Sequence, residues 1–287
     1  MLDKLKVTIQ YFLPKTLISR LVGKLASAKL GKLTTFLIAS FIKYYKIDMN
    51  EAEITDIKQF STFNDFFSRA LKKGARSIIK EPAAIAMPAD GVLSEYGEIY
   101  KDAMLQAKGH YYSLEALLGG DSKDAKVYEN GTFATVYLAP SNYHRVHMPI
   151  DGTLEKMVFV PGDLFSVNLL TASNIDNLFT RNERVICFFK NPKIGHFAVV
   201  LVGATIVASI STVFAGTVAP SGGKEKNIYH YEKDNISLKK GAELGRFLLG
   251  STVICVFPKN SIEVSARKNK GTAVKMGEEL GQIISKR

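Results

Sequence analysis

The change in hydrophobic periodicity along the chain is the feature that most constrains its fold. Apolar residues in the first 48 positions recur at helical spacing, whereas the chain beyond the turn at Met87–Gly91 consists mainly of short runs rich in Val, Ile, Phe and Thr. The clearest runs are Thr132–Leu138, Phe197–Ile206, Ile210–Ala215 and Thr252–Phe257. The sequence therefore predicts an α+β fold, with basic amphipathic N-terminal helices in residues 1–75 and a β-rich body in residues 76–287.

Three N-terminal helices are expected: one from just after Pro14 to Leu25, one over Leu30–Phe41 and one around Phe63–Leu71. The longest uncharged stretch, Leu33–Ile42, is well short of the ~20 residues that cross a bilayer. We therefore expect attachment at a membrane interface. The alternative is that the apolar stripes pack against the protein's own core.

The net charge of +11, with a pI near 9.4, indicates a polyanionic partner, either nucleic acid or an anionic lipid surface. Residues 1–48 hold nine Lys or Arg residues and two Asp residues, interleaved with apolar side chains. That mixture favours an anionic membrane surface, and no nucleic-acid-binding motif is recognisable. The two cysteines, Cys187 and Cys255, lie in apolar runs typical of buried free thiols. The N-terminus lacks the pattern of a cleavable signal peptide, so a cytoplasmic compartment is expected.

A short internal repeat marks the C-terminal third of the chain. Residues 239–245 and 275–281 share the pattern Lys-x-Gly-x-Glu-Leu-Gly, and both copies are expected to form glycine turns between strands. Such turns resemble those of lipoyl-like barrel-sandwich domains, so the β-rich body is expected to have that character.

The first candidate for chemistry is Ser251, which follows Gly250 at the start of an apolar run. A Gly-Ser pair at such a place is ordinarily a turn. A serine after glycine is nevertheless suited to attack the preceding carbonyl, because Gly250 has no side chain to obstruct the cyclic intermediate. The attack would replace the amide with an ester, and it requires a base and a group that orients the base.

His144 and His147 are the candidate bases. They lie three residues apart, and no third ligand stands at metal-binding spacing, so the pair favours proton transfer over a metal site. They could also be surface histidines beside Arg145. Asp90, in a Pro-Ala-Asp-Gly turn, is the candidate orienter, although aspartate in such a turn often bonds only its own backbone.

Together these motifs strongly resemble the bacterial membrane-associated phosphatidylserine decarboxylases. The resemblance covers nearly the whole chain and rests on Phe66–Lys72, Pro88–Gly91, His144–Pro149 and Leu249–Thr252, with further similarity in residues 106–110, 161–168 and 181–184. Leu248 stands where relatives often have a basic residue, and Phe214 where many have tryptophan. Neither position has a proposed catalytic role.

The resemblance implies that the chain cuts itself between Gly250 and Ser251. Asp90 would orient His147, His147 would activate Ser251, and Ser251 would become a pyruvoyl group with loss of ammonia. The products would be a β chain of residues 1–250 and an α chain of residues 251–287, assembled as a homodimer of such pairs.

The implied reaction is decarboxylation of phosphatidylserine to phosphatidylethanolamine and CO2, through a Schiff base on the pyruvoyl group. His144 would protonate the product carbon. Ser166 and Asn168 are candidate substrate contacts or, alternatively, turn-capping residues. No metal and no external cofactor is implied, and the enzyme would work as a peripheral protein on the cytoplasmic face of the bacterial cell membrane.

Two other functions remain open at this point. A serine hydrolase could use the same residue types, although Leu-Gly-Ser-Thr is not the Gly-x-Ser-x-Gly nucleophile elbow. A serine hydrolase would remain one intact chain. A non-catalytic lipoyl-like or membrane-binding module would neither cut itself nor release ammonia.

Overall fold

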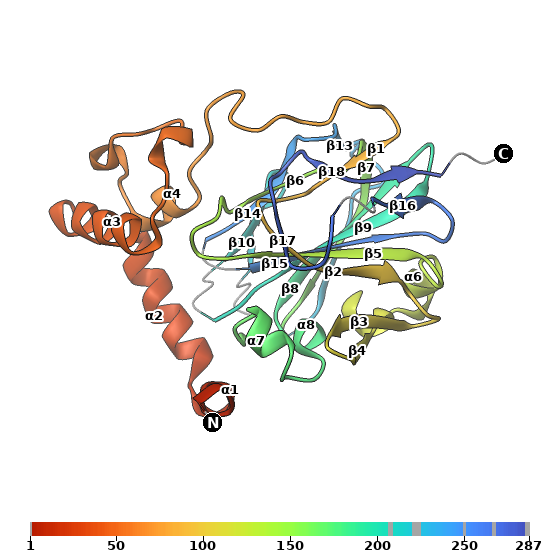
Figure 1. Ribbon diagram of the computed structural model, residues 1–287, viewed down its shortest axis with the longest axis horizontal. Coiled ribbons are helices and arrows are strands. Elements are labelled where there is room, and N and C mark those ends of the chain that lie inside the picture. Colours follow the sequence, from red (N-terminus) through yellow and green to blue (C-terminus); the bar gives the residue numbers. More distant parts are fainter. Residues whose placement is uncertain (1, 206–208, 220–224, 249–250, 266–267, 285–287) are drawn as a thin grey trace.

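The computed structural model of the chain describes residues 2–205, 209–219, 225–248, 251–265 and 268–284. Helices at the N-terminus form a small part on one side of a larger β-rich body (Figure 1). The predicted α+β class is confirmed, whereas the lipoyl-like barrel-sandwich character stays a prediction.

The N-terminal part contains four α-helices: α1 (Leu2–Phe12), α2 (Lys15–Ser27), α3 (Lys32–Tyr45) and α4 (Phe63–Phe67), with 3-10 turns η1 (Met49–Glu51) and η2 (Ile57–Gln59). The helices predicted after Pro14 and over residues 30–41 are confirmed as α2 and α3. The third is shorter than predicted, because Ser68 leaves the helical conformation and its carbonyl accepts a hydrogen bond of 2.9 Å from Arg145 Nε. A capping box between Thr62 and Asp65 fixes the start of α4.

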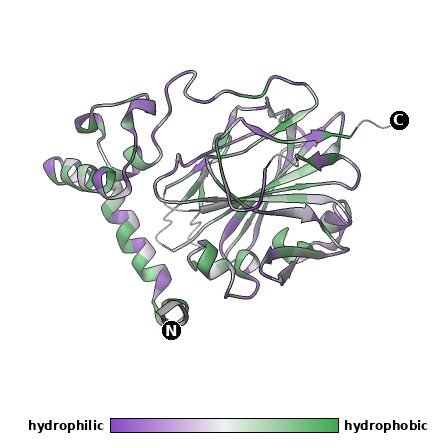
Figure 2. Cartoon of the chain, in the orientation of Figure 1, coloured by the Kyte–Doolittle hydropathy of each residue, from purple (hydrophilic) through white to green (hydrophobic). Residues whose placement is uncertain are grey.

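Only part of the apolar surface of these helices is buried. A small core separate from that of the body is formed by Ile38, Ile47, Phe60, Phe66 and Phe67. Large apolar side chains stay exposed in α2 and α3. Figure 2 shows that apolar and polar residues alternate along both helices. The most exposed are Leu17, Leu21, Leu25, Leu33, Phe36 and Tyr44. The apolar residues of α2 and α3 are therefore divided: some pack against the protein, and others face outward.

Among the described residues, no single helix is both long enough and apolar enough to cross a bilayer. The segments Leu17–Ser27 and Lys32–Tyr45 meet the length and composition test only as a pair, and they are bent by 114° at the break between them.

The body is built on a nine-stranded, antiparallel sheet, in which β13 (Ser237–Leu238) pairs with β7 at one edge. The other eight strands, in spatial order, are β12 (Asn227–His230), β7 (Gly152–Val160), β8 (Arg184–Asn191), β9 (Gly195–Val202), β15 (Ser251–Phe257), β5 (Thr132–Leu138), β2 (Gly91–Glu98) and β17 (Thr272–Val274). Both Cys187 and Cys255 are free thiols in its core, as predicted.

The predicted strands over residues 132–138 and 252–257 are confirmed as β5 and β15. The run predicted over Phe197–Ile206 forms β9 as far as Val202, after which Gly203 N and Thr205 N donate to the carbonyls of Glu183 and Phe165. Ile206 lies outside the described residues. β10 (Ile210–Thr212) stops early because Thr212 Oγ1 accepts a hydrogen bond from Ala215 N in the turn to β11 (Gly216–Ala219).

Three smaller sheets and four short helices complete the body. The sheets are β1 (Ala84–Ala86) with β18 (Glu279–Ile283) and β16 (Ile262–Val264); β11 and β10 with β14 (Glu243–Phe247) and β6 (Arg145–His147); and β3 (Ala103–Ala107) with β4 (His110–Ser113). The helices are α5 (Leu114–Leu117), α6 (Ser122–Lys126), α7 (Leu169–Ala172) and α8 (Leu178–Arg181).

Two of these sheets repeat one arrangement. In the β14–β6 pair Glu243, Gly245 and Arg246 lie opposite His147, Val146 and Arg145, and in the β18–β1 pair Glu279, Gly281 and Gln282 lie opposite Ala86, Ile85 and Ala84. The predicted glycine turns precede β14 and β18. Gly241 has φ of 80° and Gly277 has φ of 88°, a region that favours glycine, and a Cβ on either would meet Ile78.

The repeat extends into a second motif that the sequence analysis did not recognise. Residues 87–91 read Met-Pro-Ala-Asp-Gly and residues 148–152 read Met-Pro-Ile-Asp-Gly. The two motifs bond the two glycine turns in the same way: Gly277 N donates to Met87 O at 3.0 Å, and Gly241 N donates to Met148 O at 2.9 Å. Asp90 and Asp151 consequently occupy equivalent places.

Candidate active site

Asp90 lies at the centre of a buried ion network. Its carboxylate accepts hydrogen bonds from Arg76 Nη2 at 2.5 Å and Arg76 Nε at 3.0 Å, and from the backbone N–H of Met276 at 2.8 Å. Arg76 also bonds Glu51 at 2.6 Å, and the two carboxylates raise the pKa of its guanidinium. This network ties the Asp90 turn to the chain just after the N-terminal helices.

His147 lies beside that turn, because its backbone N–H donates to Pro88 O at 2.7 Å. Its ring Nδ1 is 2.8 Å from Gly241 O, so Nδ1 carries the proton, and Nε2 accepts a hydrogen bond of 3.0 Å from the Tyr143 hydroxyl. Burial lowers the pKa of His147, and the Gly241 carbonyl and the charges of Glu243 and Asp90 offset part of that shift. The ring is neutral at pH 7 and has a basic nitrogen.

The structure places Asp90 near His147 without a hydrogen bond between the two side chains. The carboxylate of Asp90 is taken up by Arg76 and Met276, while the His147 ring is oriented by Gly241 and Tyr143. Asp90 acts on His147 through its charge, which favours the protonated ring.

His144 is completely buried. Its Nδ1 donates to Asn142 O at 2.8 Å, and its ring lies 4.1 Å from the ring of Phe67 in α4, centroid to centroid. Nε2 has no hydrogen-bond partner among the described residues. Burial lowers the pKa of His144 to about 3, so that this ring is also neutral at pH 7. The exposed-histidine alternative is excluded for both rings.

Ser251 is the first residue of β15 and is fully buried. It lies opposite Leu138 of β5, and its hydroxyl has no hydrogen-bond partner in the described part of the chain. Gly250 lies outside the described residues. The end of β14, four residues before Ser251, is bonded to the segment that contains the two histidines, because Phe247 N donates to His144 O at 3.0 Å. The Ser251 hydroxyl makes no hydrogen bond to the imidazole of His144 or His147 in the described part of the chain, so the proton transfer between them stays a prediction.

Ser166 and Asn168 have local partners in the structure. Asn168 Oδ1 accepts a hydrogen bond of 2.9 Å from Thr171 N and caps α7. Ser166 N donates to Gln10 Oε1 in α1 at 2.9 Å, which ties the body to the first helix. These contacts match the turn-capping alternative for Asn168, and a role for either residue in substrate binding stays a prediction.

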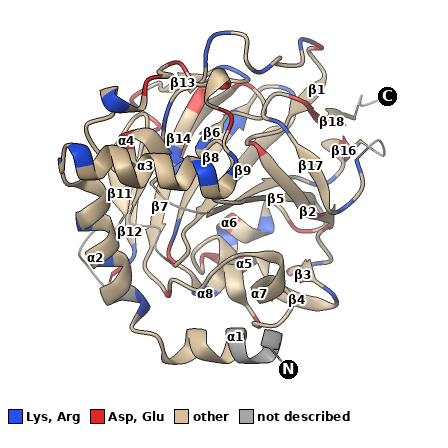
Figure 3. Cartoon of the chain, turned by 60° about the vertical axis from the view of Figure 1, so that its left-hand side comes forward, with Lys and Arg blue, Asp and Glu red and all other residues tan. Residues whose placement is uncertain are grey.

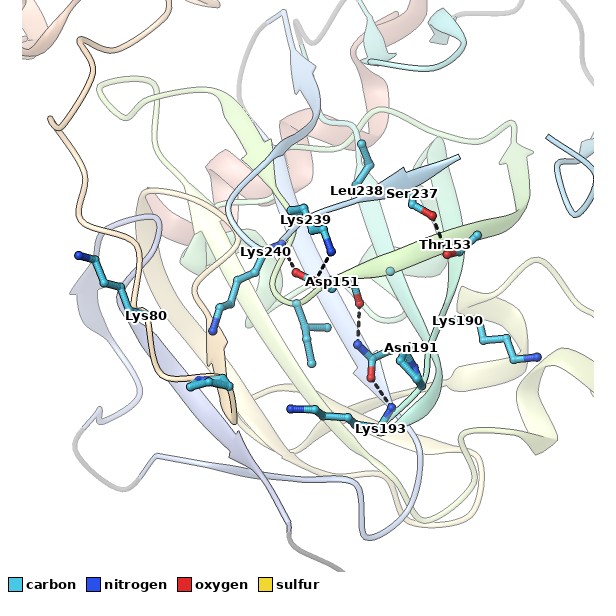
Figure 4. Close-up of a pocket in the computed structure, with 14 residues that line it drawn as sticks. Lys80, Asp151, Thr153, Lys190, Asn191, Lys193, Ser237, Leu238, Lys239 and Lys240 are labelled. Atoms are coloured by element: carbon cyan, nitrogen blue, oxygen red, sulfur yellow. Dashed lines mark hydrogen bonds and ion pairs between the residues drawn. The ribbon is translucent and has the colours of Figure 1, made fainter. Parts of the chain in front are cut away.

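The place equivalent to Asp90 holds different chemistry. Asp151 Oδ1 accepts a hydrogen bond of 2.8 Å from Lys240 N, just as Asp90 accepts one from Met276 N, and Asp151 Oδ2 pairs with Lys239 Nζ at 3.0 Å. It lines a pocket of about 460 Å³ with Lys80, Lys190 and Lys193, as Figure 4 shows. No histidine lines this pocket, and Ala86 stands opposite Glu279 where His147 stands opposite Glu243.

Within the described ranges, no group of three or more His, Cys, Asp or Glu side chains could hold a metal ion. The candidate residues are a buried hydroxyl and two buried, neutral imidazoles. A hydroxyl of this kind becomes a nucleophile when a base removes its proton.

Comparison with known proteins assigns the chain to a family. The family model described as phosphatidylserine decarboxylase matches residues 63–282, and a second, described as PSD, matches residues 5–46. The chain belongs to the phosphatidylserine decarboxylase family. The proteins named phosphatidylserine decarboxylase proenzyme from Shewanella sediminis and Psychromonas ingrahamii are 54% identical over 286 residues and 53% identical over 278 residues. These alignments cover 98% and 97% of this chain and 99% and 97% of the respective relatives.

Three residues of the candidate site were not predicted from the sequence of this phosphatidylserine decarboxylase family member. Arg76 lies in a basic loop with no local sign of a partner, and Gly241 contributes a carbonyl that no sequence pattern reveals. Tyr143 was identifiable only as the neighbour of His144. The repeated Met-Pro-x-Asp-Gly motif was a visible signal that Asp90 and the segment after His147 belong to related halves of the fold.

Proposed function

We propose that the chain is a proenzyme that cuts itself between Gly250 and Ser251 and then decarboxylates phosphatidylserine to phosphatidylethanolamine. The observation that carries the proposal is the Ser251 hydroxyl, which is buried without a hydrogen-bond partner among the described residues at the start of a central strand. Leaving a buried hydroxyl unbonded costs about 1–3 kcal/mol, so such a group requires an explanation, and a catalytic role is one of them. Membership of the family and the proenzyme names of the relatives support the same function.

In the self-cleavage step, Ser251 Oγ attacks the carbonyl carbon of Gly250 and its proton passes to His147 Nε2. The new C–O bond replaces the C–N bond between the two residues, and the proton goes to the departing amino nitrogen. Tyr143 must release Nε2 before this transfer, since its hydroxyl donates to that nitrogen. Asp90 stabilises the protonated ring through its charge. Elimination of the ester then releases the carboxylate of Gly250 and leaves a dehydroalanine at position 251. Its imine tautomer is hydrolysed by one water molecule, which supplies the ketone oxygen of the pyruvoyl group and releases ammonia.

The surroundings of Ser251 fit such a group, because the side-chain oxygen is buried and no described residue bonds it. When present, the pyruvoyl group supplies a carbonyl that accepts electrons as CO2 leaves. His144 Nε2 has no partner among the described residues and is unprotonated, so it can take a proton from the substrate ammonium and return it to the former α-carbon. No metal and no external cofactor takes part in this scheme.

The helical part, residues 1–75, attaches the enzyme to the cytoplasmic face of the bacterial cell membrane as a peripheral protein. Exposed leucines of α2 and α3 supply apolar area, and Lys24, Lys29 and Lys32 of the same segment are exposed. Figure 3 shows Lys and Arg residues along α2 and α3. Each Lys or Arg near an anionic surface contributes on the order of 1 kcal/mol. Residues 76–287 would form the decarboxylase domain, and the cleaved α and β chains would assemble as a homodimer of pairs.

Intact-mass analysis under denaturing conditions tests the cleavage. The wild-type chain should give two fragments, with the smaller one lacking a free α-amino group, whereas Ser251→Ala and His147→Ala should each give one full-length species. A single full-length species from active wild-type protein would instead support the serine hydrolase, which needs no cleavage.

A further inference from the structure

Arg69, just after α4, is a buried cation without a matching anion. Its side chain belongs to a residue that is only 7% exposed, and Nε has no hydrogen-bond partner in the described part of the chain. Among the described residues, Nη1 makes a weak hydrogen bond of 3.5 Å to Phe66 O, and Cζ of the guanidinium lies 5.2 Å from the centroid of the Phe66 ring. The nearby carboxylates of Glu51 and Asp90 are both engaged by Arg76. A buried charge in this condition is costly, so the site is suited to an anion from outside the chain.

Arg69 lines a cavity of about 310 Å³ together with Arg145, Arg246 and Ser68. Two acidic residues, Glu53 and Asp65, line it as well, and Asp65 Oδ2 accepts a hydrogen bond of 3.0 Å from Thr62 N. Glu243 pairs with Arg145 at 2.7 Å and with Arg246 at 2.8 Å. Arg69 is the one of the three arginines for which the described residues offer no carboxylate within salt-bridge distance. An anion that enters the cavity therefore meets one unpaired guanidinium, with two further arginines nearby.

The cavity adjoins the candidate active site. Phe67, two residues before Arg69, packs against His144 with the two rings tilted by 43°, and Arg145 directly follows His144 in the chain. Arg145 Nε also donates to Ser68 O at 2.9 Å, which fixes the end of α4 against β6. The charge of Arg69 contributes to the lowered pKa of His144, so the guanidinium is close enough to act on that ring.

The serine head group of the proposed substrate has two anionic groups, a carboxylate and a phosphodiester. A cation on the carboxylate would stabilise the charge that decarboxylation removes, so it would favour the ground state and slow the reaction. The phosphodiester keeps its charge throughout, and holding it fixes the head group near His144 at no such cost. Arginine also binds phosphate oxygens in a bidentate manner.

We infer that Arg69 binds the phosphodiester of the phospholipid substrate, an inference that rests on the proposed decarboxylation. Its test starts with Arg69→Gln and Arg69→Lys, and with Lys101→Gln as a control that removes an exposed charge from the body. All three variants should still give two fragments by intact mass. For phosphatidylserine in mixed micelles, Arg69→Gln should lower kcat/KM by about 30- to 100-fold, mainly through KM, and Arg69→Lys should lie in between.

Two soluble inhibitors identify the bound group. Glycerophosphoethanolamine has a phosphodiester and an amine, and O-methylserine has a carboxylate and an amine. Arg69→Gln should weaken inhibition by the first and leave inhibition by the second unchanged. The reverse pattern, or unchanged KM and unchanged inhibition by both, would overturn the inference while leaving the decarboxylase function in place.

If Arg69→Gln folds but does not cut itself, binding is measured in the Ser251→Ala background. Titration calorimetry with glycerophosphoserine should then show affinity in Ser251→Ala and a loss of at least about thirtyfold in Ser251→Ala/Arg69→Gln. Equal affinity in the two proteins would refute the assignment. Failure of the proposed function itself looks different, because the wild-type chain would then produce neither fragments nor CO2.

Discussion

Asp90 and Asp151 accept equivalent backbone hydrogen bonds, each of 2.8 Å, from the residue that precedes a glycine turn. Their surroundings differ completely. Asp90 faces Arg76 and lies beside His147, whereas Asp151 faces Lys239 and Lys240 in a pocket without histidine. One backbone arrangement thus occurs twice in the chain, with catalytic residue types in one copy only.

The repeat supplies a matched pair of variants. Asp90→Asn should slow self-cleavage by about 10- to 100-fold, because it removes a charge that favours protonated His147. Asp151→Asn removes a carboxylate from the equivalent place and should cost about 1 kcal/mol of stability, with cleavage at the wild-type rate. The measurement is the appearance of fragments on a denaturing gel over time. Equal slowing in both variants would mean that Asp90 has only a structural role.

His144→Ala should separate the two proposed reactions. His144 is bonded through Nδ1 to Asn142 O, and its free Nε2 is assigned to proton transfer during decarboxylation. The variant should therefore cut itself yet release CO2 from phosphatidylserine about 10²- to 10⁴-fold more slowly. Fragments are followed by intact mass and CO2 by a radiolabelled carboxylate. If His144→Ala blocked cleavage and His147→Ala spared it, the two assignments would have to be exchanged.

The exposed apolar face of α2 should determine membrane attachment. Leu21 and Leu25 are 59% and 52% exposed, and replacing both with Glu removes apolar area and adds charge that an anionic surface repels. The double variant should sediment with phosphatidylglycerol-containing vesicles at least about tenfold less than wild type, at unchanged thermal stability. Tyr100→Glu, at a site 72% exposed on the body, is the control and should bind like wild type.

Glu183 should make stability depend on pH. Burial raises the pKa of its carboxyl group from 4.5 to about 7 in the folded chain. Between these values the folded protein keeps a proton that the unfolded chain has lost, so the free energy of unfolding falls as pH rises and levels off above about pH 7. Glu183→Gln should remove this loss, which amounts to at most about 3 kcal/mol.

The corresponding measurement is thermal unfolding at pH 5 and pH 8. Glu183→Gln should be more stable than wild type by several degrees at pH 8 and by less at pH 5. A gain of equal size at both values would show that the carboxyl group does not titrate in this range.

Local sequence patterns were sufficient to predict most of the strands and the two glycine turns. The run Thr132–Leu138 matches β5 because its Val, Phe and Tyr residues fit a buried sheet, and the glycine turns at Gly241 and Gly277 were visible because their positive φ angles favour glycine. The end of α4 was predicted too late, since the chain leaves the helix to meet Arg145, a contact between residues far apart in the sequence.

The candidate site was predictable only in its residue types. Asp90, His144, His147 and Ser251 come from separated segments, and the family resemblance supplied their proposed roles. The partners could not be predicted, because Arg76 on Asp90, Tyr143 and Gly241 on His147, and Phe67 on His144 depend on tertiary packing. Nor could the sequence predict that Arg69 is buried without a carboxylate partner among the described residues.

The position of β15 has a consequence for the order of events in the life of the proenzyme. The strand is bonded along both edges, to β9 and to β5, so the fragment that starts at Ser251 would remain threaded through the middle of the sheet after the proposed cut. Its partners come from distant segments, so the sheet must form before the reacting groups can meet. Synthesis as one chain gives this segment a high effective concentration at its place between β9 and β5. Two separately made pieces would have to meet there by diffusion.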